Sequence, residues 1–227
     1  MISRNQNMGF TLIELLVSIA IIGVMAALLL SALSRAKNQT KEITCLNNLK
    51  QWGLATRYFT DEHDDFLPDN GSVAPINNYV GTGWYMQLPP EIGLPLYTAM
   101  PWRTNKSPLV DLGHSIWICP ANKRYSTNGA YLFHYSLNEL WNGVGDSNHP
   151  IKMSAIRIPP SVAVWLVDSR TDPPVGSNTA VHTNLHASGA NLLFLDGHAA
   201  WVKSTEYYDF KLKKYFTNNP SMVWKQW

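Results

Sequence analysis

The first sixty residues contain one long apolar run and, after it, a stretch in which apolar and polar positions alternate with a helical period. In residues 10–33 the only polar side chains are those of Thr11, Glu14, Ser18 and Ser31. A helix of that length spans about 36 Å, whereas the core of a bilayer is about 30 Å thick. The run therefore predicts one membrane-spanning helix.

The same helix is expected to continue beyond the apolar run. The apolar residues that recur at helical spacing are Ile43, Leu46, Leu49, Trp52 and Phe59, with Leu54 and Tyr58 widening the face. They leave a polar face on the opposite side, as in a helix that packs against a soluble domain. No proline precedes Pro68. We therefore expect one helix over about residues 10–60, with a transmembrane part at 10–33 and an amphipathic continuation at 34–62.

Residues 63–227 are expected to form a globular head. Its first part, about 68–161, is rich in proline, glycine, asparagine and aromatic residues, which favour irregular structure. The candidate strands in this insert are Ser115–Ile118 and Tyr131–Leu137. Two further apolar stretches, Trp84–Leu88 and Tyr97–Met100, are ambiguous between helix and strand. We expect the individuality of the protein, and its choice of partner, to reside in this insert.

The C-terminal part, about residues 162–203, is predicted to supply the sheet. Val162–Val167 is a dense apolar run with the length of a buried strand. Leu192–Leu195 and Ala199–Val202 are predicted to be two strands joined at an Asp-Gly dipeptide, which is a strong hairpin signal. The expected fold class is therefore α+β, with a long N-terminal helix packed on a small antiparallel β-sheet.

Charge and cysteine content narrow the function classes. The 227 residues carry 18 lysines and arginines against 16 acidic residues, and no basic block stands out, so a nucleic-acid partner is not expected. The only cysteines are Cys45 and Cys119. In an exported head we expect them to form a disulfide that contributes about 4 kcal/mol. Two buried thiols are the alternative, and a metal site on two cysteines would need further ligands.

Three interpretations of the N-terminal segment compete. A cleaved secretory signal would end its apolar core after about 7 to 15 residues at an A-x-A-like site, which is missing here. A plain anchor helix fits the length but leaves Glu14 unexplained, because an unpaired carboxylate in lipid costs several kcal/mol. The third interpretation rests on a resemblance and also accounts for Glu14.

The sequence MISRNQNMG followed by FTLIELLVSIAIIGVMAALLL closely resembles the class III signal of type IV pilins and type II secretion pseudopilins. It shares the short polar leader with a positive charge at Arg4, the terminal Gly9, and Glu14 in an otherwise apolar helix. The resemblance implies that residues 1–9 are a leader, and that a prepilin peptidase cuts between Gly9 and Phe10 and methylates Phe10. It implies a pilin-like fold and a single-pass protein of the bacterial inner (cytoplasmic) membrane. The N-terminus would lie inside and the head outside, in a periplasmic or extracellular filament after assembly.

Electrostatics supplies a role for Glu14 in such a protein. After cleavage Phe10 would carry an ammonium group at the edge of the bilayer, one helical turn from the Glu14 carboxylate. Each charge is costly alone in a low dielectric, so pairing Glu14 with the Phe10 ammonium of a neighbouring subunit would relieve both and fix the axial register. Pairing within one subunit, or a protonated Glu14, are the alternatives before assembly.

Two further stretches extend the resemblance. Residues 36–51 (AKNQTKEITCLNNLKQ) and the H-x9-D-G element formed by His186 and Asp196 resemble those of a large group of bacterial pilin-like proteins. The weak candidates for ligands of a metal such as Zn²⁺ or Mn²⁺ are Asp168, His182, His186, Asp196 and His198. We favour a structural interpretation, in which Asp196 caps its own turn and His186 forms a hydrogen bond to a strand end.

The sequence thus predicts a structural subunit rather than an enzyme, with no cofactor. Its expected partners are copies of itself or other pilin-like subunits in a type IV pilus or a type II secretion pseudopilus. The prepilin peptidase/methyltransferase, the inner-membrane assembly machinery and the lipid bilayer are further expected partners. The alternative is a membrane-tethered metal-dependent hydrolase or carbohydrate-binding head that uses His186, Asp196 and the tryptophan-rich insert. No H-E-x-x-H, nucleophile-elbow or paired-glutamate pattern supports it.

The leader makes a prediction about the mature protein. Mass spectrometry of assembled material should find methylated Phe10 as the first residue, because the peptidase would remove residues 1–9. An intact Met1 in assembled material would contradict the interpretation of this segment as a prepilin signal.

Overall fold

One helix, α1 (Leu12–Glu62), runs through the N-terminal apolar run and on into the head in the computed structural model of the protein. The described residues are 12–71, 83–109, 111–113, 115–126, 132–138, 141, 151–170, 175–216 and 218–224. Gly9 and Phe10, the predicted cleavage site, lie outside them. The chain divides into two units, residues 1–40 and 41–227, and each is described by itself.

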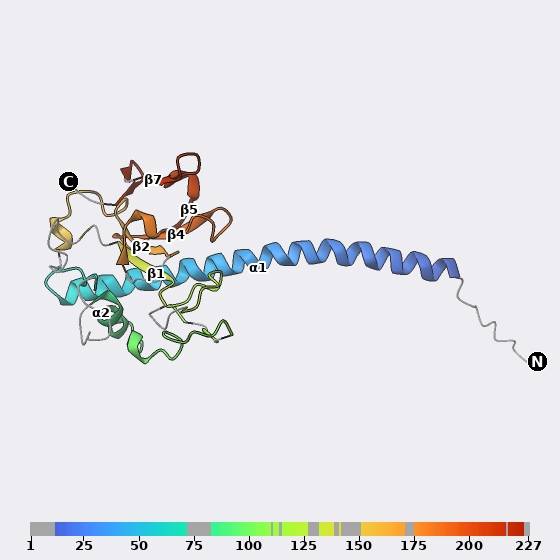
Figure 1. Ribbon diagram of the computed structural model, residues 1–227, viewed down its shortest axis with the longest axis horizontal. Helices are drawn as coiled ribbons and strands as arrows, with labels where there is room; N and C mark the ends of the chain where they lie inside the picture. Colours follow the sequence, from blue (N-terminus) through green and yellow to red (C-terminus); the bar gives the residue numbers. More distant parts are fainter. Residues whose placement is uncertain are drawn as a thin grey trace, which may run out of the picture. The chain divides into compact units, whose positions relative to one another are not determined.

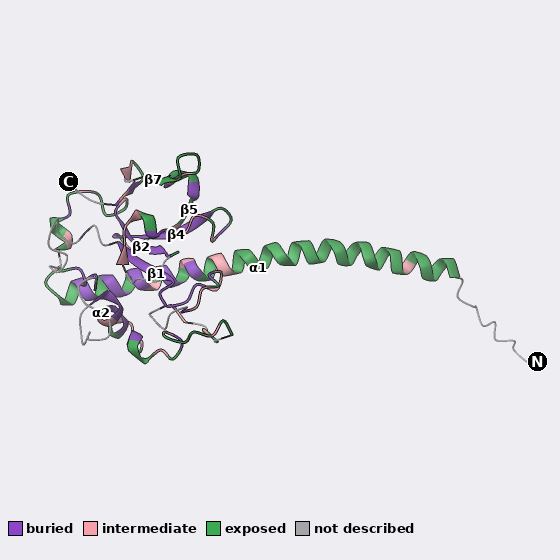
Figure 2. Ribbon diagram, in the orientation of Figure 1, coloured by how far each residue is buried: buried purple, intermediate pink, exposed green. Residues whose placement is uncertain are grey.

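In the first unit, residues 12–40 of α1 expose their side chains almost throughout (Figure 2). Among the described residues, α1 is the one helix long and apolar enough to cross a membrane, judged by length and composition alone. Two of its hydroxyl groups are satisfied inside the helix. Ser18 Oγ donates to the Glu14 carbonyl at 2.6 Å, and Ser31 Oγ donates to the Leu28 carbonyl at 2.9 Å. These serines therefore need no partner outside their own helix.

In the second unit, α1 buries one face in the head. The buried residues on it are Cys45, Asn48, Leu49, Trp52, Gly53, Ala55, Thr56, Phe59 and Thr60. Ile43, Leu54 and Tyr58, which were expected on the apolar face, are exposed instead. The buried face is rotated from the predicted one because polar residues such as Asn48 and Thr56 are part of it. A search for apolar positions alone overlooks them.

The head is built around a five-stranded sheet with the strand order β3-β1-β2-β4-β5 (Figure 1). Its strands are β1 (Tyr135–Asn138), β2 (Val164–Asp168), β3 (Val175–Gly176), β4 (Gly189–Phe194) and β5 (Ala199–Lys203). Neighbouring strands are antiparallel, except that β1 and β3 are parallel. The α+β class is confirmed, and β2, β4 and β5 confirm the three strands predicted in residues 162–203.

The two faces of the sheet are covered by different parts of the chain. On one face, Trp165 of β2 and Leu193 of β4 belong to the same apolar cluster as Trp52 of α1. On the other face, a second cluster includes Tyr207 and Trp224 from the C-terminal segment. The sheet is therefore the middle layer of the head, which explains why every residue of β1, β2 and β4 is buried.

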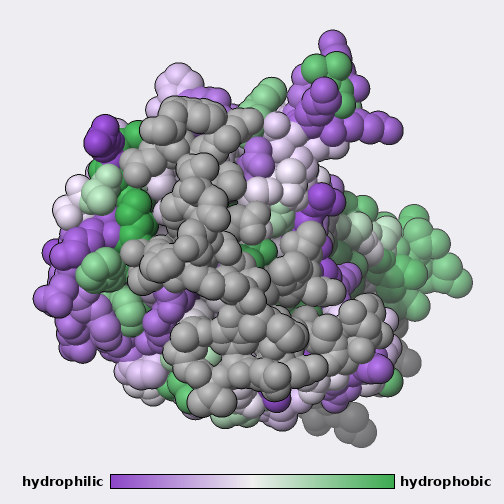
Figure 3. Space-filling model, turned by 60° about the vertical axis from the view of Figure 1, so that its left-hand side comes forward, coloured by the Kyte–Doolittle hydropathy of each residue, from purple (hydrophilic) through white to green (hydrophobic). Residues whose placement is uncertain are grey.

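The remaining elements of the C-terminal part are short. They are the 3-10 helices η4 (Met153–Ala155), η5 (Asn178–Ala180) and η6 (Ser204–Glu206), and the strand pairs β6 (Tyr208–Asp209) with β7 (Lys214–Tyr215) and β8 (Asn218–Asn219) with β9 (Met222–Val223). On the near face of the head in Figure 3, hydrophilic residues cover much of the coloured surface, and the hydrophobic residues form small separate areas.

The predicted strand at Ser115–Ile118 is wrong. This segment forms a turn in which the Ile118 N–H donates to the Ser115 carbonyl at 3.1 Å. Its apolar side chains are buried, as they would be in a strand, but its carbonyl groups accept hydrogen bonds from side chains. Trp52 Nε1, for example, donates to the Ile116 carbonyl at 3.1 Å. The apolar residues of this segment are buried without pairing to a strand, which is why their pattern wrongly predicted a strand.

The other predicted segments of the insert are partly helical. The first ambiguous stretch lies in α2 (Trp84–Glu91), which extends beyond it, and the second contains the 3-10 helix η2 (Tyr97–Ala99). Of the predicted strand Tyr131–Leu137, only the C-terminal end is a strand, in β1. Tyr131 itself lies outside the described residues.

Aromatic side chains connect the insert to α1. The Trp52 ring lies 5.4 Å from that of Trp84 and 4.5 Å from that of Trp117, measured between centroids. Nearby, Tyr97 stacks on Phe133 at 4.2 Å. Such pairs contribute about 0.5–1.5 kcal/mol each beyond the burial of their area. These tryptophans of the insert therefore form core rather than a surface platform.

The turn between β4 and β5 packs directly on α1. Gly197 in this turn has a φ of 90°, which favours glycine. A Cβ at Gly53 of α1 would lie 3.1 Å from the Gly197 carbonyl oxygen and 2.9 Å from Leu193 Cδ1. A side chain at position 53 would push the helix and the turn apart, so glycine is what permits their close approach.

Candidate functional site

The structure places the predicted histidines and carboxylates in two separate pairs. The first joins His186 Nε2 to Asp168 Oδ2 at 3.2 Å, and its side chains are 1% and 0% exposed. The second joins His198 Nδ1 to Asp196 Oδ1 at 2.6 Å, with side chains 45% and 36% exposed. His186 and Asp196, the two ends of the H-x9-D-G element, therefore belong to different pairs.

The buried pair is held by the sheet and by the tight turn that precedes β4. Asp168 is the last residue of β2, and its Oδ2 also accepts the N–H of Asn191 in β4 at 2.7 Å. His186 and Gly189 exchange two backbone hydrogen bonds across a turn in which Ala187 and Ser188 have φ of 44° and 66°. The turn fixes the His186 backbone, so its imidazole lies over the end of β2.

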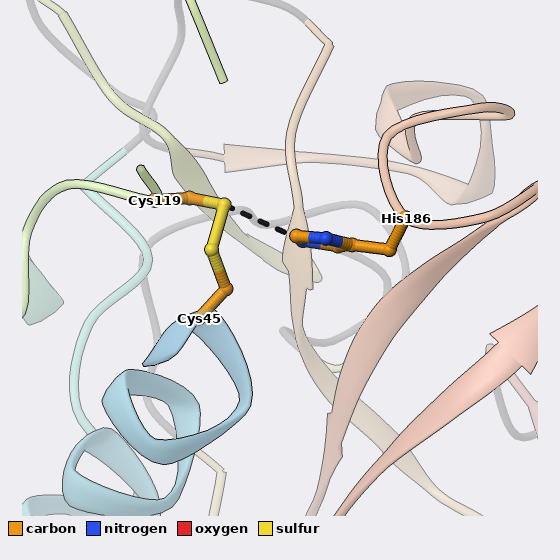
Figure 4. Close-up of side chains that lie close together, drawn as sticks. All are labelled: Cys45, Cys119 and His186. Atoms are coloured by element: carbon orange, nitrogen blue, oxygen red, sulfur yellow. Dashed lines mark hydrogen bonds between the residues drawn. A yellow bond between two sulfur atoms is a disulfide. The ribbon is translucent and has the colours of Figure 1, made fainter. Parts of the chain in front are cut away.

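The disulfide lies against the same imidazole. Cys45 of α1 and Cys119 of the insert are bonded, and their positions in the sequence are 74 residues apart. Figure 4 shows the His186 ring directed at this bond, with Nε2 3.4 Å from Cys119 Sγ. Both cysteines are fully buried. α1, the insert and the turn before β4 thus meet at one point in the interior of the head.

The exposed pair has the geometry of a turn cap. Asp196 Oδ1 accepts the backbone N–H of His198 at 3.0 Å in addition to its contact with the ring. The His198 ring stacks on Phe194 at 4.4 Å between centroids. Asp196 thereby closes the β4–β5 turn that packs on α1.

His182 is separate from both pairs in its hydrogen bonding. Its Nδ1 accepts the Asn184 N–H at 3.2 Å, and burial lowers its pKa, against the opposing effect of the Asp168 charge. Among the described residues, the side chains that gather closely enough to share a metal ion are those of Cys45, Cys119 and His186. The five predicted metal candidates therefore do not form one site.

A second buried histidine supports the disulfide loop. His134 Nδ1 accepts the Cys119 N–H at 3.2 Å, and Nε2 lies 3.2 Å from the Arg124 carbonyl. Both contacts are satisfied by a neutral ring that carries its proton on Nε2. Burial, with the Arg124 charge as the next cause, lowers the pKa of His134 to about 4.

Sequence reasoning missed the partner of His186. The H-x9-D-G spacing directed attention to Asp196, whereas the partner is Asp168, at the end of the apolar run that became β2. A carboxylate that closes a fully buried strand is itself a signal, because such a group must find a partner when it is buried.

Comparison with known proteins gives matches to the N-terminal part and to about a third of the chain. Residues 4–30 match the family model of the prokaryotic N-terminal methylation motif. The chain is also similar to the type IV major pilin protein PilA of Myxococcus xanthus (strain DK1622), with 34% identity over 79 residues. The chain is therefore similar to a type IV pilin over about a third of its length, and it carries a prepilin-type methylation motif at its N-terminal end. The alignment covers 34% of this chain and 36% of PilA, and no solved structure matches the chain.

The two histidine–aspartate pairs predict unequal effects on the stability of the head. Asp168→Ala should lower the free energy of unfolding by about 3–5 kcal/mol, because it leaves His186 buried without its partner. Asp196→Ala should cost about 1 kcal/mol or less, because that pair is half-exposed. Urea unfolding followed by tryptophan fluorescence measures both. Equal losses in the two variants would contradict the placement of the pairs.

His134 predicts a dependence of stability on pH. Its pKa falls from 6.5 to about 4 on folding, so between these values the unfolded chain binds a proton that the folded head does not. The free energy of unfolding should therefore decrease as the pH falls from about 6.5 to 4, by about 1 kcal/mol per pH unit from this residue.

The measurement is urea unfolding at a series of pH values. His134→Gln should flatten the slope in this window, because glutamine binds no proton there. A slope that persists in His134→Gln would show that other groups cause it.

Proposed function

We propose that this pilin-like protein is a structural subunit that assembles through α1 into a type IV pilus or a type II secretion pseudopilus. Before assembly, a prepilin peptidase would cut between Gly9 and Phe10 and methylate Phe10. The observation that carries the proposal is the match to the methylation motif over residues 4–30, which contains both residues and Glu14 and leads into an apolar helix.

The position of Glu14 supports assembly through the helix. Glu14 lies in the first turn of α1, where the helix dipole favours a carboxylate by about 0.3–1 kcal/mol. That gain is small beside the several kcal/mol that a charged group costs in lipid. We propose that the Glu14 carboxylate pairs with the Phe10 ammonium of a neighbouring subunit after assembly, and that this pairing sets the axial position of one helix against the next.

The contacts between the head and α1 support a role in transmitting force along a filament. In a filament whose subunits are joined through their helices, force reaches a head only if that head is firmly attached to its own helix. Within the second unit, Cys45 is covalently bonded to Cys119, and Asn48 Nδ2 donates to the Ile118 carbonyl at 3.0 Å. The indole of Trp52 and the close contact of Gly53 with the β4–β5 turn add to this grip.

Partners and location follow from the same proposal. The subunit would be held in the bacterial inner membrane by α1, with the leader inside and the head outside, until the assembly machinery extracts it. The protein to which it is similar carries the name of a major pilin, which supports a filament role for this chain as well. Lipid, the peptidase and other pilin-like subunits would then be its successive partners.

A membrane-tethered hydrolase or carbohydrate-binding head has less support. His186 and Asp168 are buried, so a substrate has no direct approach to this pair. Asp196 is engaged in its own turn, and the insert residues Trp84 and Trp117 pack in the core. The arrangement fits the holding of α1 better than the binding of a ligand.

Replacement of Glu14 tests the assembly proposal. Glu14→Ala should leave the protein in the membrane but reduce sheared filaments by at least about tenfold, which corresponds to about 1.4 kcal/mol per contact. Membrane and filament fractions are compared by immunoblotting. Glu14→Gln should behave in the same way, because it removes the charge and keeps the shape.

The matched control is Ser18→Ala, one turn further along α1. Its hydroxyl group bonds only within the helix among the contacts described, so filaments should form as in the wild type. Normal filaments in both Glu14 variants would overturn the role of the carboxylate.

A further inference from the structure

Three side chains that can ligate a metal converge in the interior of the head. The Sγ atoms of Cys45 and Cys119 and a ring nitrogen of His186 lie within 4.8 Å of one another, and all three residues are buried (Figure 4). They come from α1, from the insert and from the turn before β4. In the oxidised state the two sulfur atoms are bonded to each other.

The spacing of these atoms is close to that of a tetrahedral zinc site. With Zn–S near 2.3 Å and Zn–N near 2.0 Å, a sulfur and a nitrogen on the same ion are about 3.6 Å apart. His186 Nε2 lies 3.4 Å from Cys119 Sγ. Two thiolates on one zinc ion are about 3.8 Å apart, which is farther than two sulfur atoms in a disulfide. The two sulfur atoms must therefore move apart when the disulfide is reduced and zinc binds.

A carboxylate borders the same point. Asp168 Oδ2 lies 3.2 Å from His186 Nε2, although Asp168 is not one of the three residues whose ligand atoms all lie within 4.8 Å of one another. The other oxygen, Oδ1, is buried with no hydrogen-bond partner among the described residues. A buried acceptor without a donor is costly, and a cation would satisfy it.

We propose that the reduced head binds one Zn²⁺ through Cys45, Cys119 and His186, with the carboxylate of Asp168 beside the site. A dithiol or phosphine reductant supplies two electrons, and two protons convert the disulfide to two thiols while the reductant is oxidised. Zinc then displaces the two thiol protons to solvent. His186 binds through Nε2 as a neutral ring that carries its proton on Nδ1.

At such a site, zinc would replace the disulfide as the link between α1 and the insert. The same ion would join α1, the insert and the turn before β4 in a head that has not yet been oxidised. This inference does not depend on filament assembly, because it concerns only the interior of the second unit.

Cobalt provides a direct probe, because tetrahedral Co²⁺ on thiolates absorbs visible light whereas Zn²⁺ does not. The full chain in detergent, reduced with a phosphine, should bind one Co²⁺ per molecule and show thiolate-to-cobalt charge-transfer bands. Added Zn²⁺ should bleach them. The oxidised protein should show no such bands. Their absence from the reduced wild-type protein, folded by circular dichroism, would overturn the proposal.

Variants identify the ligands. His186→Ala and Cys45→Ser should weaken Co²⁺ binding to the reduced protein by at least about 100-fold, and Asp168→Asn by about tenfold or more. His198→Ala, in the exposed pair, is the matched control and should bind as the wild type does. Cobalt bands of unchanged strength in His186→Ala would place the metal elsewhere. Where a variant unfolds, the difference between the reduced and oxidised wild type still decides the proposal.

Discussion

The burial of one face of α1 is the constraint on which the rest of the head depends. Successive turns of that face each hold a different part of the chain. Cys45 is bonded to the loop at Cys119, Asn48 donates to the Ile118 carbonyl, and Gly53 admits the turn between β4 and β5. A buried polar group needs a partner, and here the partners are backbone carbonyls of the insert. The helix therefore fixes the position of the described segment around residues 115–119, which has little regular structure.

The parts of the fold that were predictable are those set by local pattern. The length of α1 follows from an apolar run that continues as an amphipathic helix without proline. The β4–β5 hairpin follows from two short apolar runs joined by an Asp-Gly turn. The pattern was less informative about which way the helix faces. Asn48 and Thr56 are buried because they have hydrogen-bond partners, and the pattern of apolar residues contains no record of such partners.

The unpredictable parts depend on contacts between segments far apart in sequence. In the parallel pairing of β3 with β1, Leu137 lies opposite Val175. Nothing in the sequence of either short strand predicts this pairing. At Ser115–Ile118, burial against α1 imitated the signal of a strand. In the candidate site, Asp168 and Asp196 could be assigned to their histidines only from the positions of β2 and of the hairpin. The sequence shows which histidines and aspartates are present, but it does not show which histidine pairs with which aspartate.

The disulfide also changes what a cut in the backbone would do. Its two cysteines are 74 residues apart, and the chain between them forms a closed covalent ring that includes the end of α1, all of α2 and much of the aromatic insert. Hydrolysis of any single peptide bond inside this ring opens it but releases no fragment. The sheet remains covalently attached to α1 through the sulfur atoms. A head displayed where proteases are present would thus lose a loop connection without losing its attachment to the helix.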